Sequence, residues 1–195
     1  LFSKHLNGKI QNCTDLYYLG VLLMSKSAQK ILATAEKLFN ENSFVAVGVD
    51  LIRDESGCSK TTMYTYYKNK SHLVESVLIA RNEKFKQSLF QYIGKSQGVD
   101  AINKIVEWHI QWFHQDYFKG CLFVRAVAES NSNEKNIIAI SQQHKQWIKD
   151  LIFNHCAFAK REDLSELIYT ILEGLISRFL VDGFDLNIAE NIKSK

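Results

Sequence analysis

The sequence contains no proline among its 195 residues. Because proline interrupts the interior of a helix, its absence favours long, continuous helices, as does the frequent use of Leu, Ile, Ala, Glu, Lys and Gln. Hydrophobic residues make up 46% of the chain and charged residues 23%, which is typical of a globular rather than a disordered protein. The length suits one or two domains with a well-buried core.

Closely spaced metal-binding residues are also absent. The four cysteines, Cys13, Cys58, Cys121 and Cys156, lie far apart and form no CxxC or Cys/His pattern of the kind that binds zinc. We therefore expect reduced thiols in a cytoplasmic protein with no metal and no cofactor.

No apolar run is long enough to span a membrane. The run from Leu16 to Met24 is much shorter than the roughly 20 residues that a spanning helix needs. With Lys4 and Lys9 upstream it faintly resembles a signal peptide, but Met24 stands just before a clear helix start. We expect residues 1–23 to be an extension or a disordered tail, and we expect no membrane partner.

A strong excess of positive charge is missing as well. The net charge is +3, so any argument for a nucleic-acid partner depends on where the charges lie. Between Ser56 and Lys70 there are three lysines, three tyrosines and no acid. The preceding acids Asp50, Asp54 and Glu55 belong to the helix before, where Asp54 and Glu55 are expected to face away from DNA.

Three short helices are predicted in a head domain over residues 24–70. The first carries an apolar stripe at helical spacing: Ile31, Leu32, Ala35, Leu38 and Phe39. Gly48 can begin the second helix and Ser59 the third. Gly57 suits the left-handed turn of a helix-turn-helix. Met63 and Tyr67, four residues apart, form the buried side of the last helix.

A larger helical body is predicted over residues 71–195. A long helix is expected to start at Asn69 or Ser71 and to end near Ile93. Further helices are expected near residues 99–115, 121–130, 134–158 and 162–182. Since no strand pattern competes, the fold class is all-α, an N-terminal three-helix head followed by a helical body.

One stretch resembles the DNA-binding domain of the TetR/AcrR family. It reads ILATAEKLFNENSFVAVGVDLIRDESGCSKTTMYTYYKNKSHLVESVL, and the match covers roughly residues 28–78. The residues that carry the resemblance are Ile31, Ala35, Leu38, Phe39, Ile52, Ser56, Gly57, Cys58, Ser59, Tyr64, Tyr66, Tyr67, Lys70 and Leu73.

The resemblance implies a double-stranded DNA operator as partner, contacted at base edges and phosphates. The implied contact residues are Gly48, Ser59, Lys60, Thr61, Thr62, Tyr64, Thr65, Tyr66 and Lys70. Three positions depart from the family pattern. Ser43 replaces a turn glycine, Val47-Gly48 replaces a Thr/Ser pair, and Thr61 replaces a smaller or stiffer residue.

For the body, the resemblance implies homodimerisation and a ligand pocket. The segments 134–158 and 162–182 would pair with their copies as a four-helix bundle. The candidate ligand-binding residues are Trp108, His109, Trp112, Phe113, Cys121, Phe123, Arg125 and Glu129. For any single aromatic residue, ordinary core packing is the better explanation, and His109, Arg125 and Glu129 could equally be core polar or surface residues. Cys121 could be an inert small residue or a sensor of oxidants or electrophiles.

The expected function is therefore a homodimeric transcriptional regulator, a repressor that an unknown small-molecule inducer releases from DNA. An alternative is a helical small-molecule-binding protein with impaired or no DNA recognition, which Val47-Gly48 favours. An enzyme is not expected, because no nucleophile–base pair or phosphate loop rises above chance. His109 and His114, for example, are five residues apart and do not share a helix face.

Overall fold

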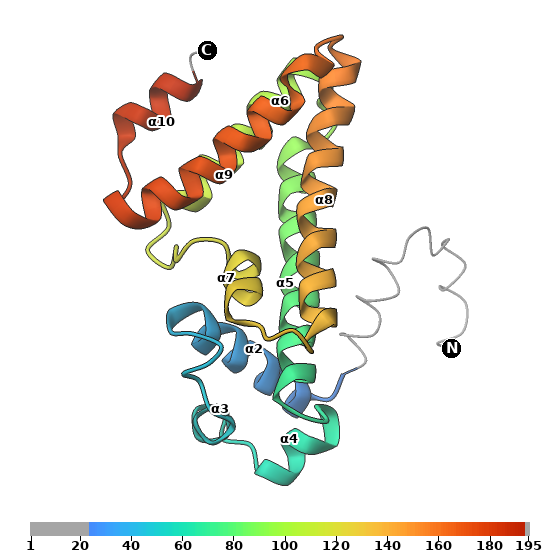
Figure 1. Ribbon diagram of the computed structural model, residues 1–195, viewed down its shortest axis with the longest axis vertical. Helices are drawn as coiled ribbons and strands as arrows, with labels where there is room; N and C mark the ends of the chain where they lie inside the picture. The colour runs from blue at the N-terminus through green and yellow to red at the C-terminus, as the bar shows by residue number, and fades with distance from the viewer. Residues whose placement is uncertain (1–23, 194–195) are drawn as a thin grey trace, which may run out of the picture.

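The computed structural model describes residues 24–193, which form helices and no strand (Figure 1). The predicted all-α fold is therefore confirmed for this part of the chain, while the predicted N-terminal extension, 1–23, lies outside it. The helices are α2 (Lys26–Glu41), α3 (Val49–Ser56), α4 (Lys60–Tyr66), α5 (Lys70–Ile93), α6 (Gly98–Phe113), α7 (Leu122–Glu129), α8 (Lys135–Phe158), the short 3-10 helix η1 (Glu162–Leu164), α9 (Ser165–Asp182) and α10 (Leu186–Lys193).

Short-range signals fix where the first helices begin and end. Ser59 Oγ accepts a hydrogen bond from the Thr62 amide at 3.0 Å and caps α4. Asn69, rather than Ser71, caps α5, because its Oδ1 accepts from the His72 amide at 2.8 Å. Gly57 has φ +60°, a left-handed conformation that residues with a side chain rarely adopt. The predicted turn is thus confirmed.

Helices α2, α3 and α4 form the head at one end of the molecule (Figure 1). Its centre is filled by fully buried side chains from each of these helices, including Ile31, Ile52 and Met63. Tyr67 is buried as well, and its hydroxyl donates to the Ala28 carbonyl at 2.9 Å. Burial raises the pKa of Tyr67 to about 12, so the phenol stays protonated.

The body is built around α5 and α8, which lie side by side along the long axis of the molecule (Figure 1). Helices α6 and α9 pack against α8, and α10 covers part of α6. α7 lies between the head and α8. One apolar cluster runs without a break from Phe39 in the head through Val77 of α5 to Phe123 and Phe179 of the body. A change in body packing can therefore reach the head.

The body boundaries differ slightly from the sequence expectation. Helix α6 begins at Gly98 rather than Val99 and ends at Phe113 rather than near Gln115. The segment 162–182 is divided into η1 and α9, with Ser165 hydroxyl donating to the Glu162 carbonyl at 2.9 Å near the junction. Among residues 24–193, no helix combines the length and apolar character needed to cross a membrane.

Candidate nucleic-acid interface and effector pocket

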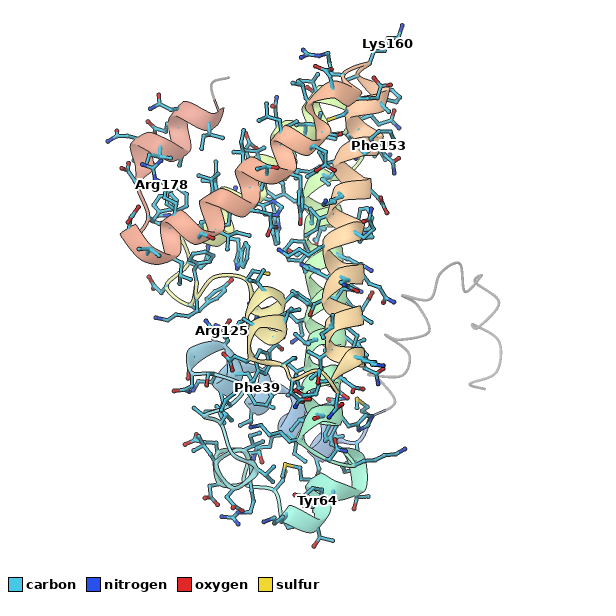
Figure 2. All side chains as sticks on the ribbon, viewed as in Figure 1. Phe39, Tyr64, Arg125, Phe153, Lys160 and Arg178 are labelled. Atoms are coloured by element: carbon cyan, nitrogen blue, oxygen red, sulfur yellow. The ribbon has the colours of Figure 1, made fainter. Side chains whose placement is uncertain are left out.

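Helix α4 has one buried and one exposed side. Met63 is buried within the head, as predicted, and Tyr67 is buried just beyond the end of the helix. The opposite side carries Tyr64, 45% exposed, and Tyr66, 38% exposed. Tyr64 lies at the outer end of the head in Figure 2. The structure therefore brings the predicted DNA-contacting side chains of this helix to an open surface.

Several predicted DNA-contacting hydroxyls are already used inside the helix. Besides capping α4, Ser59 Oγ lies 2.8 Å from Thr62 Oγ1. Thr65 Oγ1 donates to the Thr61 carbonyl at 2.9 Å. The hydroxyls of Tyr64 and Tyr66 have no hydrogen-bond partner among the described residues. The two tyrosines and Thr61 are therefore the groups most available to an operator.

Lys60 is held by an acid from the preceding helix. Its Nζ lies 3.4 Å from Asp50 Oδ1, and the same oxygen accepts from Arg53 Nη1 at 2.9 Å. Arg53 also pairs with Asp54 at 2.7 Å. Neither the role of Arg53 nor a partner for Asp50 is among the sequence predictions. The spacing of three residues on one helix predicts the Asp50–Arg53 ion pair. The contact of Asp50 with Lys60 depends on how two helices meet at the turn, and the sequence does not predict it.

We expect Asp50→Asn to strengthen binding to a non-operator duplex about two- to threefold. The slope of log affinity against log salt concentration should also steepen, by an amount that corresponds to about one additional phosphate contact. The substitution removes an acid beside the proposed DNA-binding surface and releases Lys60. Fluorescence anisotropy over a salt series measures both quantities. Asp150→Asn, the same charge change on α8, should leave both unchanged, and an unchanged slope for Asp50→Asn would contradict the prediction.

The other two predicted contact positions lie near the start of α3. Gly48 is the N-cap of α3, and a side chain added there would meet nothing within 4 Å. The start of α3 is therefore sterically open to a phosphate. Lys70 Nζ lies 3.4 Å from the Val45 carbonyl, so this lysine connects the start of α5 to the loop before α3.

Four of the predicted ligand-binding residues line one cavity of about 220 Å³: Trp108, Trp112, Cys121 and Phe123. Phe85, which sequence reasoning missed, stands at the centre of its aromatic wall. Its ring centroid is 4.7 Å from that of Trp108 and 4.9 Å from that of His144. His109 and Phe113 do not line the cavity but are buried next to it, packed against Trp112.

Two histidines beside the cavity are held in the neutral form. Burial lowers the pKa of His109 to about 4, although the Ile105 carbonyl, 2.7 Å from its Nδ1, partly opposes this shift. Burial, reinforced by nearby Lys145, lowers the pKa of His144 to about 2. His144 Nδ1 lies 2.8 Å from Asn82 Oδ1, and its ring stacks on Phe123 at 3.7 Å. At neutral pH both rings are uncharged, His144 in the cavity wall and His109 behind it.

Arg125 lies away from the aromatic cavity and contacts the head. Its Nη1 donates to the carbonyls of Phe39, Asn40 and Asn42 at 3.1, 3.0 and 2.9 Å, and its Nη2 donates to the Lys119 carbonyl at 2.7 Å. The last turn of α2 leaves carbonyls without helical partners, and a guanidinium can satisfy several of them. The structure therefore gives Arg125 a position between domains rather than in the cavity.

Glu129, one turn further along α7, is directed to the head in the same way. Its Oε2 accepts from the Val45 amide at 3.0 Å. Asn40 adds a third link, because its Nδ2 donates to the Tyr117 carbonyl at 3.1 Å. One end of α7 thus lines the cavity through Phe123, while Arg125 and Glu129 fasten the same helix to the loop after α2.

The cavity and its surroundings offer no arrangement for metal binding among the described residues, since no three His, Cys, Asp or Glu side chains come together. Cys121 is the N-cap of α7, and it is 9% exposed at the cavity wall. A wider, open groove of about 820 Å³ lies between α7, α8 and α9. Its rim carries glutamines and lysines, whereas aromatic side chains line much of the smaller cavity.

One side of α9 carries exposed residues at helical spacing: Leu167, Thr170, Ile171, Gly174, Arg178 and Val181. Leu167 is 54% exposed and Val181 is 81% exposed. A side chain added at Gly174 would meet nothing within 4 Å. Phe153 of α8, 49% exposed, adds to the apolar surface of the body. We call the six α9 residues the α9 stripe.

Comparison with known proteins agrees with this geometry. Residues 31–77 match the family model for "Bacterial regulatory proteins, tetR family". The transcriptional regulator UidR of Escherichia coli K12 is 22% identical over 153 residues, which cover 78% of this chain and 75% of UidR.

Solved structures show the same fold over most of both chains. Escherichia coli NemR in its reduced form has a TM-score of 0.75 at 16% identity and covers 87% of this chain and 95% of its own. SCO4454, a TetR-family regulator from Streptomyces coelicolor, has a TM-score of 0.73 at 19% identity, with coverage of 86% and 89%. These solved structures show that most of the chain has this fold. The family-model match over residues 31–77 and the UidR match, together with the exposed face of α4, support a TetR-family transcriptional regulator with a DNA-binding helix-turn-helix domain.

Proposed function

We propose that the protein is a homodimeric repressor that a small ligand releases from its operator. Residues 24–70 would form the DNA-binding unit, and residues 71–195 would bind ligand and form the dimer. The observation that carries the DNA-binding role is the two-sided α4. It is anchored by buried Met63, and it presents Lys60 and the free hydroxyls of Tyr64 and Tyr66 to solvent. Such groups suit phosphates and base edges in a major groove.

The α9 stripe supports dimerisation. One head contacts few base pairs, so proteins of this kind gain specificity by presenting two heads to two half-sites. Exposed Leu167, Ile171 and Val181 along one helix face are costly to leave in water, and Gly174 among them allows close approach of a second helix. Pairing of α8 and α9 with their copies would bury this face.

The position of the cavity supports release by a ligand. Its walls come from α5, α6, α7 and α8, and one wall residue, Glu36, belongs to α2 of the head. A ligand that binds better to one head orientation than to the other shifts the population towards that orientation. α7 is placed to transmit this shift, because it contacts both the cavity and the loop after α2.

A gel-shift series with the promoter next to the protein's own gene tests the proposal. We expect Lys60→Ala combined with Tyr66→Phe to weaken operator binding roughly ten- to a hundredfold, because a phosphate or base contact is lost at each position. Lys95→Ala, which removes an exposed lysine from the body, should bind like the original protein. If the double variant binds the operator as tightly as the original protein, the exposed side of α4 is not the DNA-binding face.

A second candidate is a ligand-binding protein that no longer recognises DNA. The ion pair between Lys60 and Asp50 favours it, because it occupies the only lysine of α4. A folded dimer that fails to shift any promoter fragment at low salt would support this candidate over the repressor.

A further inference from the structure

Arg81 of α5 lines the cavity, and its guanidinium has few partners among the described residues. Its side chain is 19% exposed, and burial lowers its pKa, although the neighbouring Glu36 opposes that shift. Its one ion pair joins Nη1 to Glu36 Oε1 at 3.5 Å, too long for a strong hydrogen bond. Among the described residues, no acceptor is hydrogen-bonded to the guanidinium, which carries five N–H donors.

The local charge is not balanced. Lys84 Nζ lies 2.6 Å from Glu36 Oε2, so one carboxylate faces two cations. Glu36 is the one acid among the described residues that line the cavity. A mostly buried charge without full pairing is costly, and an added anion would relieve that cost.

The rest of the cavity suits a flat, apolar group. Trp108 and Trp112 lie near Phe85, and Phe123 is stacked on the neutral His144. The Trp108 indole N–H already donates to Ser88 Oγ at 3.0 Å, so the indole presents its ring rather than its polar group. At about 220 Å³ the cavity is smaller than the usual range for drug-sized ligands, which favours a ligand of one or two rings.

We propose that this cavity binds a small aromatic carboxylate, whose carboxylate pairs with Arg81 while its ring contacts Trp108 and Trp112. A guanidinium and a carboxylate fit each other through two parallel hydrogen bonds. The inference deepens the proposed function, since it assigns a chemical class to the releasing ligand.

The ligand competes with Glu36 for Arg81. Glu36 belongs to α2 in the head, and Arg81 belongs to α5 in the body, so their ion pair is a link between the two domains. When the ligand takes Arg81, Glu36 keeps only Lys84, and the α2–α5 contact weakens. Ligand binding and the DNA-bound position of the head then oppose each other, as reciprocal coupling requires.

Isothermal titration with three matched probes tests the class: 2-naphthoate, the neutral 2-naphthamide, and the cation 2-naphthylmethylammonium. We expect 2-naphthoate to bind roughly tenfold or more tightly than the amide, and the cation to bind most weakly, because only the acid gains a charge-assisted pair. Equal binding of acid and amide, preference for the cation, or binding of none of the three would overturn the inference.

Variants place the effect on the named residues. Arg81→Gln should weaken 2-naphthoate roughly tenfold but leave 2-naphthamide unchanged, and Arg81→Lys should restore only part of the loss. Glu36→Gln should strengthen 2-naphthoate several-fold by removing its competitor. The exposed Lys95→Gln, with the same charge change as Arg81→Gln, is the control, and circular dichroism checks that each variant is folded. If Arg81→Gln weakens acid and amide alike, or Glu36→Gln has no effect, the assigned contact is wrong.

A gel shift on the same protein preparation separates the two proposals. We expect 2-naphthoate, but not 2-naphthamide at the same concentration, to release the operator fragment. If 2-naphthoate binds the protein but does not change its affinity for the operator, the inference is wrong while the proposed DNA binding is retained. If the protein binds 2-naphthoate in the calorimeter but shifts no promoter fragment, the proposed repressor function is wrong instead.

Discussion

Replacing Arg125 by glutamine is expected to lower the free energy of unfolding by about 2–4 kcal/mol, because up to four carbonyls lose a charged hydrogen-bond donor at once. Three of these carbonyls belong to residues 39–42 at the end of α2, and the fourth belongs to Lys119. Urea denaturation followed by circular dichroism measures the change. The glutamine amide can reach at most part of this set, since it has two donors on one nitrogen.

The same substitution should weaken operator binding roughly tenfold, because a head that is free to reorient must give up that conformational freedom when it binds DNA. Arg125→Lys keeps the positive charge but not the planar fork, so it should recover only a minor part of both losses. Glu129→Gln tests the neighbouring link to the Val45 amide and should have a smaller effect, since the amide oxygen can still accept. Unchanged stability and operator affinity in Arg125→Gln would mean that α7 does not hold the head.

Most of the head follows from signals within a few residues of each other. Gly57 sets the left-handed turn, Ser59 caps α4, and Asn69 caps α5, and each acts on an amide or a dihedral angle nearby. The spacing of Met63 and Tyr67 indicates the buried side. These features are local, and for that reason the sequence predicts them without knowledge of the body.

The candidate ligand site and the contacts that join α7 to the head depend instead on pairs of distant residues. Arg125 meets carbonyls 83 to 86 residues away, and His144 meets Asn82 across 62 residues. No periodic pattern encodes such pairs. Sequence reasoning therefore found the aromatic members of the cavity from their spacing on α6. It placed Arg125 and Glu129 with them because both are polar groups that could orient a ligand inside an apolar cavity.

The same limit explains why Arg81 and Glu36 were missed. Each lies on an amphipathic helix where a charged residue is usually a solvated one. Only the packing of α2 on α5 brings the two side chains together at a cavity. Charged residues with partners on another element become recognisable as site residues once the fold is known.

Placing a charge in the α9 stripe is expected to have the largest effect on DNA binding. Leu167→Asp together with Ile171→Asp puts two acids on a face that would meet its own copy, so four carboxylates would come close in the dimer. Burial of unpaired like charges costs several kcal/mol, which is enough to shift the protein to monomers at micromolar concentration. Both residues are exposed in the single chain, so its fold should be retained.

If the proposed dimer is lost, the second head is no longer held close to the operator by the first. We therefore expect operator affinity to fall by roughly a hundredfold or more. Analytical ultracentrifugation reports the monomer, and gel shift reports the affinity. Leu186→Asp, which adds a single acid at an exposed apolar residue of α10, should leave the proposed dimer and the affinity intact. If the double variant stays dimeric, the dimer interface lies on another face and not on the α9 stripe. A double variant that becomes monomeric yet binds the operator normally would show instead that a single head is sufficient for recognition.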